Sequence, residues 1–354
     1  MNCPVCNKEV LFSKIFSACY ECIKLNRNNI LSEIITKHSK IRKEFKLSET
    51  IPHGGNTNCK ICANNCSMKE NEISYCGLRT VKNNKIVILT EGENKAVLDW
   101  YFDPLPTNCV AEWVCSGSKQ TNKKNLAVFY GSCSFNCLFC QNWHFKTYKP
   151  QMFNSISAKT LASYADNKTY CVCFFGGDPS TQMPHSLATA KFLSEKNIKI
   201  CWETNGSMNK NFLKKAIELS LSSGGCIKFD LKAFDENIHY ALCGVSNKQT
   251  IENFKFAAEY INKRREPPLL IASSLLIPGY IDEEEIYKIA SFIYSLDKSI
   301  PYCLLLFYPS FVLNDLSMTS KEQAYRCLKA AKNAGLVNVK LGNIHLLSMD
   351  NFLI

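Results

Sequence analysis

From residue 125 onwards, short apolar runs alternate with longer stretches in which apolar residues recur at helical spacing. The apolar runs predict strands at 125–130, 170–175, 198–203, 225–231, 269–277, 302–308 and 337–341. The stretches between them predict helices near 157–166, 181–195, 209–222, 248–264, 283–296 and 319–334. Apolar strands that alternate with helices indicate a parallel sheet covered by helices. About six such units predict an α/β fold, an incomplete (β/α)6-type TIM barrel.

The part of the chain before this alternation is rich in cysteine and divides into shorter segments. We expect a zinc-knuckle-like segment at 1–30, a basic linker at 31–58 and a Cys-rich element at 59–120, followed by the barrel at 121–354. The basic stretch 27–47 is compatible with a helix, and "KIVILTEG" at 85–92 predicts a strand. The predicted fold therefore includes a small Cys-rich, metal-stabilised N-terminal extension.

The composition is ordinary for a globular protein, with 46% hydrophobic and 21% charged residues among 354. No apolar run approaches the length of a membrane span and no signal peptide is recognisable, so we expect a cytoplasmic protein without a membrane partner. The formal net charge of +11 suits an anionic cofactor or an acidic protein partner. Nucleic acid stays possible but is disfavoured, because no RNA-reading strand or helix-turn-helix is recognisable.

Twenty cysteines are too many for an ordinary core, and in a reducing compartment clustered thiols indicate metal ligands. The first cluster joins two C-x-x-C knuckles, "CPVC" and "CYEC", which supply Cys3, Cys6, Cys19 and Cys22. Two such knuckles present four sulfurs to one ion and predict a structural zinc site, with an iron centre as the alternative. So short a segment buries little core, so the metal would supply its folding energy.

The second cluster consists of Cys59, Cys62, Cys66 and Cys76. Four thiolates predict another closed structural site, but their irregular spacing leaves zinc and an iron–sulfur cluster both open. Cys109 and Cys115 follow in a proline-containing connection. They are either additional ligands or ordinary core and loop residues, and we favour the second interpretation.

The third cluster, in "GSCSFNCLFCQNW", contains only three cysteines, Cys133, Cys137 and Cys140, directly after a predicted strand. Three thiolates hold a metal centre with one open position or depend on a distant fourth ligand. The C-x3-C-x2-C form, with an aromatic residue before the third cysteine, resembles the radical S-adenosylmethionine (radical SAM) superfamily. The resemblance implies a [4Fe–4S] cluster on these cysteines, with S-adenosyl-L-methionine bound at the fourth iron. We therefore assign the cluster and the catalytic role to them.

Polar residues follow three of the predicted strands, where α/β barrels keep their chemistry. "FFGGDPS" contains Gly176, Gly177 and Asp178 and resembles the Gly-Gly-Glu-Pro segment of the superfamily, with Asp in place of Glu. The resemblance implies that these residues bind the cofactor, as do Thr204, Asn205 and Gly206 of "WETNGS" and Asp230 and Lys232 of "FDLKAFD". Asp178 and Asn205 could instead cap helices.

Four stretches, "GLR" after Cys76, "CSFNCLFCQNW", "DLKAFDENIHYALCG" and "LLIPGYIDEEEI", look like the pyruvate formate-lyase activating enzymes and their AmmeMemoRadiSam-like and archaeal relatives. Tyr308 stands where many members of that branch have histidine, so no role of that histidine carries over. His144, Tyr148, Tyr308 and His345 are candidate pocket residues, although ordinary loop or core roles are the simpler interpretation.

The resemblance implies that reductive cleavage of S-adenosylmethionine gives a 5′-deoxyadenosyl radical, which abstracts hydrogen from a glycyl site of a protein or peptide, or from a related substrate. It also implies an electron donor such as ferredoxin or flavodoxin. Two alternatives are an RNA-modifying radical SAM enzyme and a non-catalytic zinc or iron–sulfur scaffold.

Overall fold

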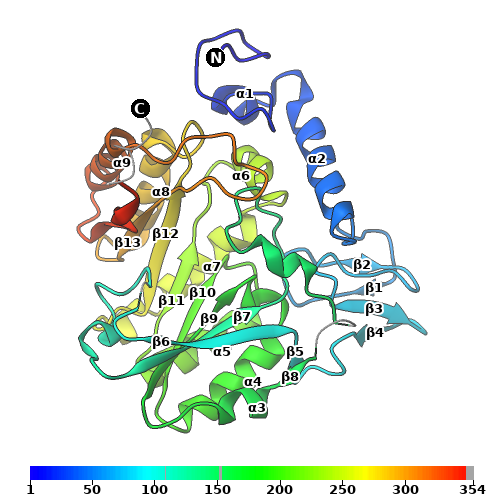
Figure 1. Ribbon diagram of the computed structural model, residues 1–354, viewed down its shortest axis with the longest axis vertical. Coiled ribbons are helices and arrows are strands. Elements are labelled where there is room, and N and C mark those ends of the chain that lie inside the picture. The colour runs from blue at the N-terminus through cyan, green and yellow to red at the C-terminus, as the bar shows by residue number, and fades with distance from the viewer. Residues whose placement is uncertain (108, 151–153, 348–354) are drawn as a thin grey trace.

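The computed structural model describes residues 1–354 except 108, 151–153 and 348–354 (Figure 1). Its centre is an eight-stranded sheet in the order β14-β13-β12-β11-β10-β9-β7-β6. These strands are β6 (Leu98–Pro104), β7 (Lys124–Tyr130), β9 (Thr169–Gly176), β10 (Lys199–Thr204), β11 (Ile227–Asp230), β12 (Leu270–Leu276), β13 (Tyr302–Leu306) and β14 (Val339–Gly342). All pairings are parallel except that of β6 with β7. The predicted α/β fold with an incomplete barrel is confirmed.

Helices follow the strands and cover the outer face of the sheet (Figure 1). They are α3 (Ala158–Ser163), α4 (Met183–Ser194), α5 (Lys210–Ser223), α6 (Glu236–Cys243), α7 (Lys248–Ala258), α8 (Glu283–Leu296) and α9 (Lys321–Asn333). Polar side chains accept the first free N–H groups of several helices, as Ser157, Asn209, Asp235 and Ser320 do. Alternate strand residues such as Phe174, Trp202 and Phe229 are fully buried and form the core.

The N-terminal extension packs on the loops that follow β11, β12 and β13. It contains α1 (Tyr20–Lys24), the 3-10 turn Arg27–Asn29 and α2 (Ile30–Glu44), so half of the segment 31–58, expected to be a basic linker, is helix. The Ser13 N–H donates to the Tyr280 hydroxyl at 2.9 Å, and that hydroxyl donates to the Ala18 carbonyl at 2.9 Å. The Tyr20 hydroxyl donates to Glu285 at the start of α8.

Three small antiparallel pairs join the extension to the barrel. They are β1 (Thr57–Asn58) with β2 (Ser67–Met68), β3 (Arg79–Lys82) with β4 (Lys85–Ile88), and β5 (Lys95–Ala96) with β8 (Ile156–Ser157). Further 3-10 turns lie at Ser116–Lys119, Trp143–Thr147, Pro179–Thr181 and Ile261–Lys263. Among the helices that the structure describes, none is both long enough and apolar enough to cross a membrane.

Two elements of the barrel differ from the sequence prediction. Strand β6 was not expected, because "LDWYFDP" is an exposed, antiparallel edge strand with polar residues in it. Helix α6 was not expected either, because its eight residues follow a strand end that the sequence analysis interprets only as a cofactor-binding segment. Its start is fixed by the Asp235 side chain, which accepts the N–H groups of Asn237 and Ile238 at 3.0 and 3.1 Å.

Helix α2 contacts α6 through a histidine that leaves no room for a side chain at the end of α6. The His38 ring N–H donates to the Ala241 carbonyl at 3.0 Å. Gly244 ends α6 with φ of 72°, and a Cβ atom there would lie 2.8 Å from His38 Nδ1. Gly224 ends α5 with φ of 81°, but its Cβ would only meet the flexible Lys199 side chain at 3.5 Å.

We therefore expect Gly244→Ala to destabilise the protein more than Gly224→Ala. Both variants place alanine in the left-handed region, which costs about 1–2 kcal/mol. Only Gly244→Ala adds a clash with a buried ring, so its midpoint of thermal unfolding should be the lower of the two. Equal midpoints would show that α2 yields at this contact.

Candidate functional site

The three cysteines of the motif lie on a loop that leaves the carboxyl end of β7 and is anchored by its main chain. The Asn136 N–H donates to the Cys243 carbonyl at 2.9 Å, and the Leu138 N–H donates to the Leu242 carbonyl at 3.0 Å. The Leu138 carbonyl accepts the N–H groups of Val312 and Leu313. The loop is therefore fixed between α6 and the segment after β13, while Cys133, Cys137 and Cys140 stay half-buried at its surface.

Buried cations surround these thiols. Lys146 Nζ donates to the Asn136 side chain at 3.0 Å and lies close enough to all three sulfurs to interact electrostatically with them. Arg42, which is 2% exposed, faces Cys133 from α2, and Lys232 faces Cys137 from the end of β11. Buried positive charge favours the thiolate form of cysteine, which is the form that binds metals.

A fourth thiol lies beside the motif. Cys243 Sγ, at the end of α6, is 3.5 Å from Cys137 Sγ. The hydrogen bond between the Cys137 and Cys243 thiols, together with the positive charges of Lys232 and Lys146, lowers the pKa of Cys137, although burial acts in the opposite direction. Burial raises the pKa of Cys133 and Cys140 instead. Cys243 had not been singled out, since a lone cysteine before a glycine carries no motif.

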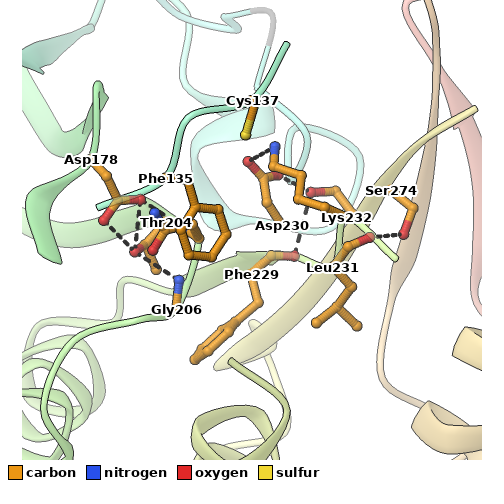
Figure 2. Close-up of polar contacts among 12 residues, drawn as sticks. Phe135, Cys137, Asp178, Thr204, Gly206, Phe229, Asp230, Leu231, Lys232 and Ser274 are labelled. Carbon is orange, nitrogen blue, oxygen red and sulfur yellow. Dashed lines mark hydrogen bonds and ion pairs between the residues drawn. The ribbon is translucent and has the colours of Figure 1, made fainter. Parts of the chain in front are cut away.

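Asp178 does not point freely into a cavity but is the centre of a hydrogen-bonded network (Figure 2). Its carboxylate accepts the Ser180 and Asn205 N–H groups at 2.7 and 2.6 Å and the Thr204 hydroxyl at 3.1 Å. Burial raises its pKa to about 6. The capping interpretation describes this geometry, so Asp178 orients Thr204 and Asn205. A direct cofactor contact for Asp178 remains a prediction.

Asn205 connects this network to the motif loop. Its side-chain amide donates to Ser134 Oγ at 2.9 Å and lies 3.6 Å from Cys133 Sγ. Gly177 lies against the start of the same loop, because a Cβ atom there would collide with the Tyr130 and Ser132 carbonyls. Gly176 and Gly206 both adopt positive φ, at 97° and 70°. The ends of β9 and β10 therefore approach the motif closely.

Asp230 and Lys232, at the end of β11, form an ion pair at 2.7 Å (Figure 2). The Ser273 hydroxyl on β12 donates to the other Asp230 oxygen at 2.6 Å. Lys232 is directed toward the motif, 5.8 Å from the centre of the Phe139 ring, and its pKa is raised by Asp230 and Cys137 despite burial. The structure thus brings residues predicted from three strand ends to one side of the motif loop.

The two upstream cysteine groups differ in geometry. The sulfurs of Cys3, Cys6, Cys19 and Cys22 all lie within 4.8 Å of one another, as one shared metal ion requires. Throughout the described ranges, no other group of three or more potential ligands is this tight, so Cys59, Cys62, Cys66 and Cys76 are not arranged around one ion. Thiolates that bind different irons of a cluster stand further apart, and the motif cysteines share this wider spacing.

The second cysteine group nevertheless lies at the candidate site. The Asn64 amide donates to the Ser134 carbonyl at 2.8 Å, and the Ser132 hydroxyl donates to the Cys76 carbonyl at 2.9 Å. The Ala63 N–H donates to the Ser207 carbonyl at 2.7 Å. The loop carrying these cysteines is therefore docked on both the motif loop and the end of β10.

The candidate pocket residues are dispersed. His144, Tyr308 and His345 are exposed, and Tyr148 borders a small cavity with Cys133 and Lys149. The sequence did not reveal Arg42 or Lys146, because a basic stretch and a lone lysine look like solvated surface. Cys109, interpreted as an ordinary residue, lies beside a buried lysine on the inner face of the sheet.

Comparison with known proteins supports the resemblance to radical SAM proteins. The sequence family described as the Radical SAM superfamily matches residues 127–293, which include the motif loop and the strand ends around it. Residues 127–293 form a radical SAM domain. A protein of Methanocaldococcus jannaschii, named as a glycyl-radical enzyme activating enzyme, is 31% identical over 181 residues, or 51% of this chain and 65% of its own length.

The pyruvate formate-lyase 1-activating enzyme of Escherichia coli K12 is 23% identical over 165 residues, covering 45% of this chain and 63% of its own length. This chain thus spans slightly less than two thirds of both relatives. Among solved structures, a domain of a pyruvate-formate lyase-activating enzyme from Bacteroides vulgatus is 20% identical, with a TM-score of 0.42, and covers 49% of this chain and 99% of its own.

The match to this superfamily implies a [4Fe–4S] cluster and S-adenosylmethionine, and the residues present fit the cluster. Three soft thiol donors stand on a loop that hydrogen bonds hold in place. The cations Arg42, Lys146 and Lys232 around them offset the negative charge that thiolates and a cluster bring into a buried site.

Three buried histidines predict acid sensitivity. Burial lowers the pKa of His38, His185 and His239 from 6.5 to about 4. Between these values the unfolded chain binds protons that the folded chain does not, so stability falls as the pH falls from 6.5 to 4. Each histidine accounts for at most about 3 kcal/mol. Asp178 and Asp282 oppose this below pH 6, since burial raises the pKa of each to about 6.

His239→Gln should therefore make the midpoint of thermal unfolding less dependent on pH in this window. Glutamine keeps a donor for the Val245 carbonyl, which the His239 ring contacts at 2.7 Å, but does not titrate. His53→Gln, at an exposed position, is the matched control and should leave the dependence unchanged. An unchanged slope for His239→Gln would contradict the assignment.

Proposed function

We propose that the chain is a radical SAM enzyme that abstracts hydrogen from a glycyl site of a protein or peptide. The catalytic part of this proposal rests on one observation, namely that polar residues at the ends of two strands lie beside the cysteines of the motif. Asn205 at the end of β10 reaches Cys133, and Lys232 at the end of β11 faces Cys137. These contacts support the proposal that the polar residues face a ligand at the open cluster position.

When bound, the cluster and S-adenosylmethionine supply reductive cleavage of the cofactor to a 5′-deoxyadenosyl radical. We assign the cluster to Cys133, Cys137 and Cys140 and cofactor contacts to Gly176, Gly177, Thr204, Asn205, Asp230 and Lys232. Asp178 would act mainly through the Thr204 hydroxyl and the Asn205 main chain, which it holds in place. The residues of this site thus orient the ligand and exclude water from it.

Two similarities support a glycyl substrate, namely those to a relative named as a glycyl-radical enzyme activating enzyme and to one named as a pyruvate formate-lyase 1-activating enzyme. An external one-electron donor, such as ferredoxin or flavodoxin, completes the proposal because the cluster must be reduced.

The test is anaerobic reconstitution with iron, sulfide, dithionite and S-adenosylmethionine, followed by measurement of 5′-deoxyadenosine. Cys137→Ala should abolish the product because it removes a cluster ligand, with a loss of at least about 100-fold. Cys327→Ala removes a buried cysteine of α9 and should keep the activity. Product formation by Cys137→Ala at the parent rate would sink the assignment.

The substrate is tested in the same reaction with a pool of short peptides that contain a glycine deuterated at the α-carbon. Abstraction from that glycine moves deuterium into 5′-deoxyadenosine, which mass spectrometry detects. A second pool, deuterated only on alanine, is the control. If 5′-deoxyadenosine forms but carries no deuterium from any glycine peptide, the enzyme assignment stands and the glycyl substrate fails.

We also propose that Cys3, Cys6, Cys19 and Cys22 hold one structural zinc ion, since their sulfurs already surround one position. For Cys59, Cys62, Cys66 and Cys76 the wider spacing favours an iron–sulfur cluster over a single ion.

Cys22→Ser should lower the zinc content by about one ion per chain and expose residues 1–30 to protease, because the metal stabilises this segment. Metal analysis by mass spectrometry measures the change, and Cys327→Ser is the control for loss of a buried thiol. Iron rather than zinc at this stoichiometry, or zinc retained by Cys22→Ser, would overturn the assignment.

A further inference from the structure

The knuckle segment, residues 1–24, is anchored on the barrel through buried polar contacts. The sulfurs of its four cysteines surround one position, and Cys3 and Cys22 are fully buried. Ser13, between the two knuckles, donates its N–H to the Tyr280 hydroxyl, and both residues are at most 1% exposed. So short a segment depends on its metal for a fixed shape, and the placement of these contacts therefore depends on the metal as well.

Asp315 connects this segment to the stretch of chain that supports the motif loop. One of its carboxylate oxygens accepts the Ser13 hydroxyl at 2.7 Å, and the other accepts the Lys14 N–H at 2.7 Å. Just before Asp315, the N–H groups of residues 312–313 donate to the Leu138 carbonyl at 3.0 and 2.9 Å. The knuckle segment and the motif loop therefore hold the same short stretch from its two ends.

Glu285, near the start of α8, makes the second connection and is 1% exposed. One of its oxygens accepts the Phe234 and Asp235 N–H groups, each at 2.6 Å. The other oxygen accepts the Tyr20 hydroxyl at 2.9 Å and lies 3.6 Å from Lys288 Nζ. Tyr20 lies between the two cysteines of the second knuckle, so its position follows the metal site. Because a buried carboxylate needs its donors, displacement of Tyr20 would weaken the hold on Glu285.

Helix α6 extends from this carboxylate to the motif loop. Asp235, whose N–H Glu285 accepts, caps the first turn of α6 with its own side chain. At the other end of the helix, the Leu242 and Cys243 carbonyls accept N–H groups of the motif loop. The eight residues between span about 12 Å, and α1 contacts α6 (Figure 1). The knuckle segment is thus connected to both supports of the motif loop.

We propose that the metal of the knuckle segment positions the motif loop, with Asp315 and Glu285 as the positioning residues. With the metal bound, the segment keeps the shape that presents the Ser13, Lys14 and Tyr20 donors together. Without it, the two carboxylates lose these donors, and both supports of the motif loop are held less firmly. The inference rests on the knuckle metal site and the motif cluster proposed above, and it gives the extension a role beyond its own folding.

The test removes the motif cysteines, so that the motif cluster and catalysis play no part in the outcome. The protein is the full-length variant Cys133→Ala/Cys137→Ala/Cys140→Ala, loaded with Zn²⁺ alone. Hydrogen–deuterium exchange, followed by mass spectrometry, reports how firmly segments 133–140 and 310–315 are held.

Adding Cys22→Ser removes a ligand of the knuckle metal. Segments 133–140 and 310–315 should then exchange about tenfold faster, as expected for the loss of a hydrogen-bonded anchor. Helix α5, which contacts α4 and α7, should exchange as in the parent. Unchanged exchange in 133–140 would overturn the proposal.

Asp315→Ala, in the same background, removes one connection and leaves the zinc ligands in place. It should speed exchange in 133–140 while the zinc content stays that of the parent. Asp297→Ala is the matched control, because Asp297 also accepts one hydroxyl and one N–H, both from Ser299, at 2.6 and 2.7 Å. Adding Asp315→Ala to Cys22→Ser should change the rate little further, because the metal acts through Asp315. Two effects that multiply would overturn the proposal.

Glu285 is tested in the chain that keeps its motif cysteines, after anaerobic reconstitution with iron and sulfide. Glu285→Ala should alter the electron paramagnetic resonance spectrum of the reduced protein, because the loop that carries the cluster shifts. Glu285→Gln keeps an oxygen for the two main-chain donors and an amide for Tyr20, so it should restore the parent spectrum. A parent spectrum in Glu285→Ala would overturn its positioning role. Absence of 5′-deoxyadenosine from the parent reaction would contradict the proposed function and leave the exchange results standing.

Discussion

The main-chain pairing between the motif loop and the end of α6 is the interaction on which the site depends. Asn136 and Leu138 donate to the carbonyls of Cys243 and Leu242, and all four main-chain groups are buried with their residues. Buried peptide groups must be paired, so these bonds fix the path of the loop. The thiols add weaker contacts to this frame, such as that of the Phe135 N–H with Cys133 Sγ at 3.4 Å.

The positive charge around the motif sulfurs depends on this fixed loop. Once the loop is fixed, its sulfurs can be approached only by groups anchored elsewhere, and the cations come from α2, from the segment after the motif and from β11. Arg42 also lies close to Cys66 and Cys76, so one guanidinium serves both the motif and the second cysteine group. The N-terminal extension thus contributes to the electrostatics of the site as well as covering it.

The sequence was sufficient to predict the barrel and to identify the residues that belong to local sequence motifs. Apolar runs located the seven parallel strands, and the spacing of Cys133, Cys137 and Cys140 marked the loop. Three kinds of feature could not be predicted. Strand β6 carries edge polarity, the role of Asp178 depends on the Thr204 and Asn205 donors at another strand end, and the thiols on the inner face of the sheet meet only through strand register. Each depends on contacts between residues far apart in the chain, which produce no periodic pattern in the sequence.

The contact between Ser13 and Tyr280 joins residues 267 positions apart. During synthesis, the four cysteines of the first knuckles emerge within the first 22 residues, so a metal ion can close that tetrad long before its docking surface exists. The motif loop must wait for α6 and for residues 312–313, which are synthesised much later than the knuckles. The fold therefore imposes an order on any metal loading, because the four thiols of the knuckles are present before the motif loop is held in place.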